Sequence, residues 1–154
     1  MLSIEKLRFE GLAHDAAMFL QREHLMNAEQ WAKFVDIYRS QPDGENQGWR
    51  GEYWGKMMRG ACLVYEYTRD DELYGGLEAT VRDMLTVAEP DGRVSSYTRE
   101  TEFDSWDLWG RKYVILACEY FLDICKDENL KKDIIGFISG CADYILLHIG
   151  ADKK

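Results

Sequence analysis

The sequence lacks the long apolar segments that mark membrane-spanning and secreted proteins. No apolar run approaches the roughly 18 residues of a membrane helix, and the N-terminus carries no signal-peptide core. Positive charge is also scarce, because 19 Lys and Arg residues stand against 28 Asp and Glu residues, for a net charge of −9. Since nucleic acids and anionic membranes are bound by Lys and Arg, we expect a cytoplasmic protein with neither kind of partner.

Sequence motifs for metal binding and nucleophilic catalysis are missing as well. The cysteines form no close C-x-x-C pair and fall within apolar-periodic stretches, which predicts buried free thiols. The histidines are scattered, and the chain has no H-E-x-x-H helix, glycine-rich phosphate loop or serine nucleophile elbow. We therefore predict no metal site and no cofactor for this chain. The residues concerned are Cys62, Cys118, Cys125, Cys141, His14, His24 and His148.

The residues that are present predict a single all-helical domain over residues 1–154. Hydrophobic residues make up 46% of the chain. A chain of this length buries roughly 70% of its unfolded surface, so a packed core is expected. Apolar residues recur at helical spacing, and no stretch alternates with the period of a β-strand. Helices are expected over about residues 4–20, 27–38, 52–67, 71–88, 106–124 and 127–149.

The chain repeats itself. Trp54-Gly55-Lys56 recurs as Trp109-Gly110-Arg111, 55 positions later (109 − 54), and the acidic stretch from Thr68 recurs from Cys125, 57 positions later (125 − 68). A self-match at such a period indicates stacked supersecondary units. Each unit is predicted to be a helix hairpin, whose second helix begins at acidic residues that suit the helix dipole.

The two kinds of helix differ in their apolar pattern. Residues 106–124 are apolar around most of the helix circumference, which predicts a buried helix, whereas a helix with one apolar stripe lies on the outside. An alternation of inner and outer helices predicts part of an α/α toroid, made of about three hairpins.

Long connections precede the first helix of each hairpin, at residues 40–51 and 91–105. Equivalent links of a repeat fall on one face, and long irregular loops are commonly functional. Aromatic rings beside carboxylates and guanidinium groups suit a sugar, which offers C–H faces and hydroxyls. The candidate carbohydrate-binding residues on these loops and helix starts are Arg50, Glu52, Trp54, Lys56, Asp104, Trp106, Asp107, Trp109 and Arg111.

Structural roles are the alternative for these residues. Trp54 and Trp109 lie on apolar stripes, where tryptophan commonly packs in a core. Glu52 and Asp107 lie near helix starts, where an acid stabilises the helix dipole and pairs with neighbouring basic residues. The glycine of each triplet costs helix stability, which predicts that it allows two helices to approach closely.

At residues 48–56 (GWRGEYWGK) and 105–113 (SWDLWGRKY), the sequence resembles the β-L-arabinofuranosidase family of glycoside hydrolases. The similarity extends from the first helices to residues 150–154. It implies the N-terminal part of a catalytic α/α barrel of six hairpins. Members are retaining exo-glycosidases with a zinc-bound cysteine nucleophile and a glutamate acid/base, both further along the family's chain. The resemblance therefore implies zinc in the full-length family member, and no nucleophile or zinc ligand among these residues.

Three functions follow as hypotheses. The first is the N-terminal part of a glycosidase, which contributes sugar-binding residues to glycosidic bond hydrolysis. The second is a non-catalytic helical-repeat scaffold that binds carbohydrate or protein through its aromatic loop face. The third is another toroid enzyme, such as a sugar epimerase, which needs a histidine base. About three hairpins leave a ring unfinished, so the expected partners are the rest of the barrel or a second copy of the chain.

Overall fold

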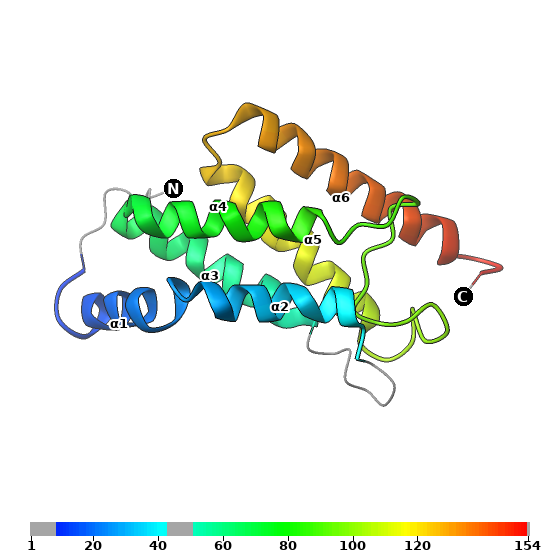
Figure 1. Ribbon diagram of the computed structural model, residues 1–154, viewed down its shortest axis with the longest axis horizontal. Helices are drawn as coiled ribbons and strands as arrows, with labels where there is room; N and C mark the ends of the chain where they lie inside the picture. The colour runs from blue at the N-terminus through cyan, green and yellow to red at the C-terminus, as the bar shows by residue number, and fades with distance from the viewer. Residues whose placement is uncertain (1–8, 43–50, 154) are drawn as a thin grey trace.

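The chain folds into helices only, over the part that the structure describes. The computed structural model describes residues 9–42 and 51–153 and has no strand within them (Figure 1). The elements are α1 (Leu12–Leu20), the π-helix η2 (Gln21–Leu25), α2 (Ala28–Ser40), α3 (Glu52–Thr68), α4 (Asp71–Leu85), α5 (Asp107–Ile124) and α6 (Glu128–His148). The predicted all-α class is confirmed. None of the described helices combines the length and apolar character needed to cross a membrane.

Side-chain caps explain where three of the helices begin. The Asn27 side chain accepts a hydrogen bond of 3.0 Å from the backbone N–H three residues further on, at the start of α2. Asp70 and Asp127 each accept a first-turn N–H at 2.8 Å, at the starts of α4 and α6. These bonds satisfy N–H groups that the first turn of a helix leaves unpaired. The acidic starts predicted for the helices that follow Asp70 and Asp127 are therefore confirmed.

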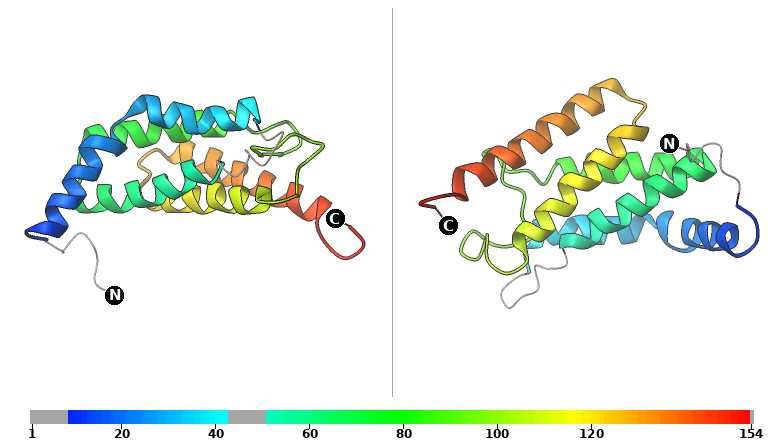
Figure 2. Two further views of the ribbon diagram at one scale, coloured as in Figure 1. Left: turned by 90° about the horizontal axis from the view of Figure 1, so that it is seen from below. Right: turned by 180° about the vertical axis from the view of Figure 1, so that it is seen from behind.

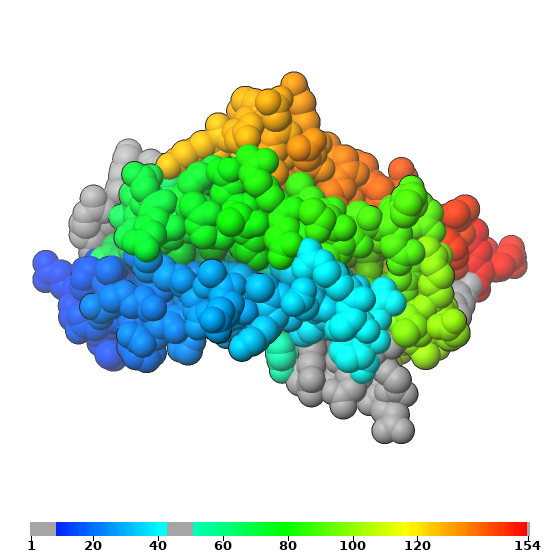
Figure 3. Space-filling model, in the orientation of Figure 1, coloured from blue at the N-terminus to red at the C-terminus, as the bar shows by residue number. Residues whose placement is uncertain are grey.

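The helices run in two opposite directions. Helices α2, α4 and α6 run one way, and α4 contacts both α2 and α6 (Figure 1). Helices α3 and α5 run the other way, behind α2 and α4, and they make the most extensive helix–helix contact in the described part (Figure 2). Figure 3 shows α2 and α4 side by side over one face of the molecule. The starts of α3 and α5 consequently lie at the same end of the bundle.

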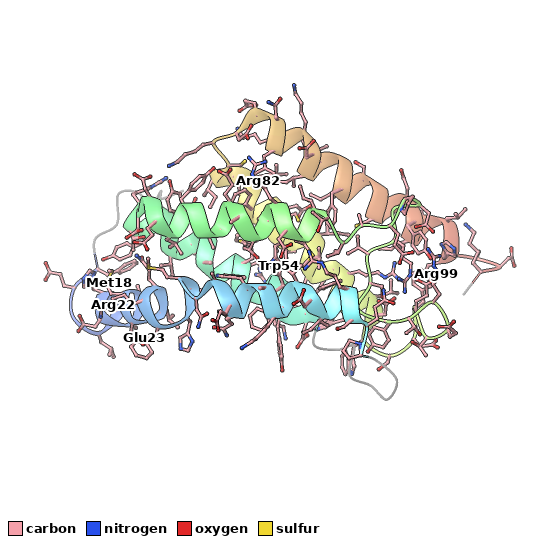
Figure 4. The ribbon with its side chains drawn as sticks, in the orientation of Figure 1. Met18, Arg22, Glu23, Trp54, Arg82 and Arg99 are labelled. Carbon is pink, nitrogen blue, oxygen red and sulfur yellow. The ribbon has the colours of Figure 1, made fainter. Side chains whose placement is uncertain are left out.

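The core lies between these layers. Trp54 of α3, labelled near the centre of Figure 4, is fully buried, and its indole N–H donates to the Thr80 hydroxyl of α4 at 3.0 Å. The cysteines are all buried and free, as predicted. Because free cysteine behaves as a small apolar residue, these thiols contribute to the core by packing.

Helix α5 departs from the prediction that it is buried all round. Its buried side chains, among them Val114 and Phe121, form a single stripe. On the other side Leu108 and Trp109 are exposed, and Ile115 is half-buried. The prediction was wrong because apolar composition does not say whether another element covers a helix. In the described part of the chain this side of α5 is open to solvent.

Helices α3 and α5 pack closely together at Gly55. A Cβ atom there would lie 2.3 Å from the carbonyl oxygen of Tyr113, so only glycine fits. Gly110, in the second triplet, faces the start of α3, where a Cβ would lie 3.8 Å from the Glu52 backbone nitrogen. The predicted close approach is therefore confirmed at Gly55, whereas Gly110 has room for a methyl group.

Candidate functional site

The starts of α3 and α5 lie together, next to the connection that leads from α4 to α5. Gly51, just before α3, lies so close to Ser96 of this connection that a Cβ at Gly51 would be 2.3 Å from the Ser96 hydroxyl oxygen. Tyr38, near the end of α2, donates a hydrogen bond to the Gly51 carbonyl. The two helix starts thus come together, as predicted. Residues 43–50, and with them Arg50, lie outside the described ranges.

Five side chains at these helix starts form a group that we call the aromatic cluster: Glu52, Lys56, Trp106, Trp109 and Tyr113. The Trp109 indole N–H donates to one oxygen of Glu52, and Lys56 Nζ lies 2.7 Å from the other. The Trp109 ring meets those of Trp106 and Tyr113 edge to face, with centroids 6.2 Å and 5.3 Å away. Trp106 is 53% exposed and Trp109 is 42% exposed, so both indoles are accessible from solvent.

Two ammonium groups hold the rings of the cluster in place. Lys112 Nζ lies 3.6 Å from the ring centroids of both Trp109 and Tyr113. Lys56 Nζ lies 5.1 Å from the Tyr113 ring centroid. Exposed cation–π contacts contribute about 0.5–1 kcal/mol each. Trp109 is therefore fixed from two sides, by Glu52 at its N–H and by Lys112 at its face.

The loop before α5 has a strained backbone. Phe103 has a φ of 65° and Ser105 a φ of 49°, in the left-handed region that side chains with a Cβ rarely adopt. The Asp107 carboxylate holds this turn by accepting the Phe103 N–H at 2.8 Å, and the Arg111 guanidinium lies 4.5 Å from the Phe103 ring centroid. Such strain costs about 1–3 kcal/mol per residue and clusters at functional sites. Here it immediately precedes the exposed Trp106.

A second group, which we call the buried ion network, ties this loop to α5 and α6. It consists of Arg93, Glu102, Asp107, Arg111 and Tyr144. One Glu102 oxygen accepts from Arg93 and Arg111 at 2.7 Å each, and the other accepts from the Tyr144 hydroxyl at 2.8 Å. Arg111 also donates to Asp107 at 2.9 Å. Buried charges are tolerated when each has a partner, as these do.

The protonation states of Glu102 and Tyr144 favour a structural role for the network over a role in proton transfer. Burial alone raises the pKa of the Glu102 carboxyl, but hydrogen bonds from Arg93, Tyr144 and Arg111 bring the pKa below its usual value. Burial raises the pKa of the Tyr144 phenol, and its bond to Glu102 raises that pKa further. At neutral pH Glu102 therefore has no proton to donate, and Tyr144 keeps its proton.

Three of the buried thiols, those of Cys62, Cys118 and Cys141, are poor nucleophiles. Burial raises the pKa of Cys62 and of Cys141 to about 12, and it raises the pKa of Cys118 as well. The thiolate is the reactive form of cysteine, and at neutral pH it is almost absent from these groups. Across residues 9–42 and 51–153, no cluster of three or more His, Cys, Asp or Glu side chains is placed to hold a metal ion.

The nine predicted site residues divide by burial. Those that meet at the surface are Glu52, Lys56, Trp106 and Trp109. Those that are buried are Trp54, Asp107 and Arg111. Asp104 is exposed on the loop before α5, and Arg50 falls outside the described residues. In this structure the three buried residues are out of reach of a ligand, and their contacts are those of core packing and charge pairing, the alternatives that the sequence left open.

Other residues of the site went unpredicted. Lys112 and Tyr113 belong with Trp109, and the spacing of four residues between Trp109 and Tyr113 is a signal that places both on one helix face. Arg93 and Tyr144 of the buried ion network carry no such signal. Their partners are distant in sequence or lie in an irregular loop, so the helical spacing of apolar residues does not predict these contacts.

The aromatic cluster can bind a small polar ligand, since it combines two partly exposed indole rings, a hydrogen-bonding carboxylate and an ammonium group. Glu52 is its only carboxylate, so the five residues do not contain the pair of carboxyl groups that glycoside hydrolysis usually requires. Comparison of the chain with protein-family models, with curated proteins and with solved structures finds no match in any of the three. The function is therefore inferred from the geometry of the site.

Proposed function

We propose that the aromatic cluster binds carbohydrate. The observation that carries this proposal is the exposure of Trp106 and Trp109 directly beside the ion pair of Glu52 and Lys56. A sugar ring stacks its C–H face on an indole, and its hydroxyls donate to a carboxylate and accept from an ammonium group. The cluster presents all three groups within one small surface.

Rigidity of the cluster also supports binding. Glu52 lies on α3 and Trp109 lies on α5. The hydrogen bond between these two side chains holds the starts of the two helices together, and so does the close contact of Gly55 with the Tyr113 backbone. Side chains that are already ordered lose little entropy when a ligand arrives. A weakly bound ligand such as a monosaccharide benefits most from this preorganisation.

We further propose that this surface belongs to the cleft of a glycoside hydrolase similar to the β-L-arabinofuranosidases, and that the hairpins form part of an α/α toroid. The directions of the helices support this architecture. Helices α3 and α5 run together, opposite to α2, α4 and α6 (Figure 1). The residues assigned here contribute sugar binding and not the catalytic step.

Ligand-observed NMR titration tests carbohydrate binding directly. The protein is mixed with L-arabinose, D-xylose, D-galactose, D-glucose and their methyl glycosides, and saturation transfer to the sugar protons is measured. We expect saturable transfer for at least one sugar. Trp109→Ala should weaken that binding by about tenfold or more, equivalent to about 1.4 kcal/mol, because it removes both the stacking face and the Glu52 contact.

Phe19→Ala provides the matched control. Phe19 is 54% exposed on α1, outside the aromatic cluster, so its removal takes away a similarly exposed ring and should leave sugar binding unchanged. Absence of saturable transfer for every sugar, or equal binding by Trp109→Ala and the unchanged protein, contradicts the proposal. A panel of nitrophenyl glycosides should show no turnover; measurable turnover would place a catalytic group within this chain.

A further inference from the structure

Helix α5 exposes a shallow groove on the side that faces away from the core. Figure 2 (right) shows α5 in front, between α3 and α6. Apolar surface that a soluble protein leaves open commonly marks an interaction site. The groove is lined by Leu108, Lys112, Ile115, Leu116 and Glu119 of α5 and by Ile145 of α6.

The groove carries one charge of each sign. Lys112 and Glu119 stand seven residues apart, which is two helical turns and about 10 Å along one face of α5. Among residues 9–42 and 51–153, Lys112 contacts the rings of Trp109 and Tyr113, and neither Lys112 nor Glu119 has an oppositely charged side chain within ion-pair distance. Both side chains can therefore pair with charges of an external partner without breaking an ion pair of the chain, and Lys112 can do so while its ammonium group stays over the rings.

These charges are placed symmetrically about the centre of the apolar surface. The midpoint between Lys112 and Glu119 falls between Ile115 and Leu116. When a second α5 lies antiparallel across this midpoint, each Lys112 faces the partner's Glu119, and each Ile115 meets the partner's Leu116. A surface that complements itself in this way is what a twofold interface needs.

We propose that the chain forms a twofold dimer through this groove, with α5 antiparallel to α5 of a second copy. Apolar contact lies at the centre, and an ion pair between Lys112 and the partner's Glu119 lies on each side of it. A parallel arrangement would set Lys112 against Lys112 and Glu119 against Glu119, and like charges across an interface are strongly unfavourable. This dimer does not depend on carbohydrate binding.

Sedimentation velocity over a concentration series, with two single charge reversals, tests the dimer and its orientation. The unchanged protein should shift from monomer to dimer as its concentration rises. Lys112→Glu and Glu119→Lys should each raise the dimer Kd by about tenfold or more, since each places like charges together. An equimolar mixture of the two variants should recover dimerisation, because every facing pair in the mixed dimer is then of opposite sign.

Two controls distinguish a weakened interface from a disturbed fold. Lys132→Glu makes the same charge change at an exposed position of α6 outside the groove and should leave the dimer Kd unchanged. Circular dichroism confirms that each variant keeps its helices. The proposal is overturned if the unchanged chain is monomeric at every concentration, as it would be if another part of a longer protein fills the groove. It is equally overturned if the single reversals do not weaken the dimer, or if their mixture fails to restore it.

Discussion

The starts of α3 and α5 carry the same Trp-Gly-basic triplet but bury opposite members of it. In α3, Trp54 lies in the core against Thr80, and Lys56 lies at the surface. In α5, Trp109 lies at the surface and Arg111 lies in the buried ion network. One triplet therefore contributes an apolar side chain to the core, and the other contributes a charge.

A rotation of α5 about its own axis accounts for this difference. Helix α3 buries Trp54 and Met58, and α5 buries Gly110 and Val114. These buried positions correspond at an offset of 56 residues (110 − 54), whereas the triplets correspond at 55. One residue turns an α-helix by about 100°, so the α5 triplet faces about 100° away from the direction of its counterpart.

The second helices of the two hairpins show no such shift. Helix α4 buries Leu73 and Leu77, and α6 buries Leu130 and Ile134, at an offset of 57 (130 − 73). Their capping aspartates have the same offset. The rotation is therefore confined to α5, where it brings Trp109 to Glu52 and carries Arg111 inside. The comparison teaches that similar sequence at two helix starts does not imply similar exposure.

The largest expected contrast is between the basic residues of the two triplets. Arg111→Met leaves Glu102 and Asp107 with an uncompensated buried charge, so it should lower the free energy of unfolding by about 3–5 kcal/mol. Lys56→Met breaks an exposed pair and should cost less than about 1 kcal/mol. Urea unfolding of both variants measures the difference. Equal losses would show that the rotation of α5 is not as described.

A smaller contrast separates the two glycines. Gly55→Ala forces a Cβ against the Tyr113 carbonyl and should destabilise the fold by about 1–3 kcal/mol, despite the better helix propensity of alanine. Gly110→Ala meets only ordinary contacts and should be neutral or stabilising by up to about 1 kcal/mol. Thermal unfolding distinguishes them by opposite shifts in Tm. If both variants shift Tm the same way, the close crossing at Gly55 is wrong.

Replacing either capping aspartate should lower Tm by a similar amount, because α4 and α6 bury corresponding positions at the same offset as their caps. Asp70→Ala and Asp127→Ala each remove an N-cap and one further partner, Gln21 and Arg82 respectively. Each should lower Tm by about 2–4 °C. Asp133→Ala, on the exposed face of α6, is the control and should leave Tm nearly unchanged. A large difference between the Tm losses of Asp70→Ala and Asp127→Ala would contradict the correspondence of α4 and α6.

The most specific test of the buried ion network is how the stability of the protein responds to acid. The pKa of Glu102 is lower in the folded protein than in the unfolded chain, where it is about 4.3. Its contribution to stability is therefore complete above that unfolded pKa and is lost as the pH falls through the folded pKa. Glu102→Gln, measured from pH 7 to pH 2, should lose stability less steeply below about pH 4 than the unchanged protein. Parallel curves would contradict the assigned network.

Much of the helical layout was predictable because its signals are local. The capping residues at Asn27, Asp70 and Asp127 and the apolar spacing of the helices depend only on near neighbours in sequence. The meeting of the starts of α3 and α5 was expected from the repeat, whereas the hydrogen bond between Trp109 and Glu52 was not predicted. The buried ion network was not predictable, because Glu102 and Tyr144 are 42 residues apart and are brought together only by packing. The open side of α5 was missed for the same reason.

The sequence alone determined that the described part of this chain is helical, where α4 and α6 begin, and which side chains gather at the starts of α3 and α5. Only the tertiary structure decided which of those side chains reach solvent. The physical reason is that a helix pattern defines side-chain directions relative to the helix axis, while packing sets the rotation about that axis. A rotation of one residue, about 100°, is enough to exchange a core tryptophan for an exposed one and a surface base for a buried one.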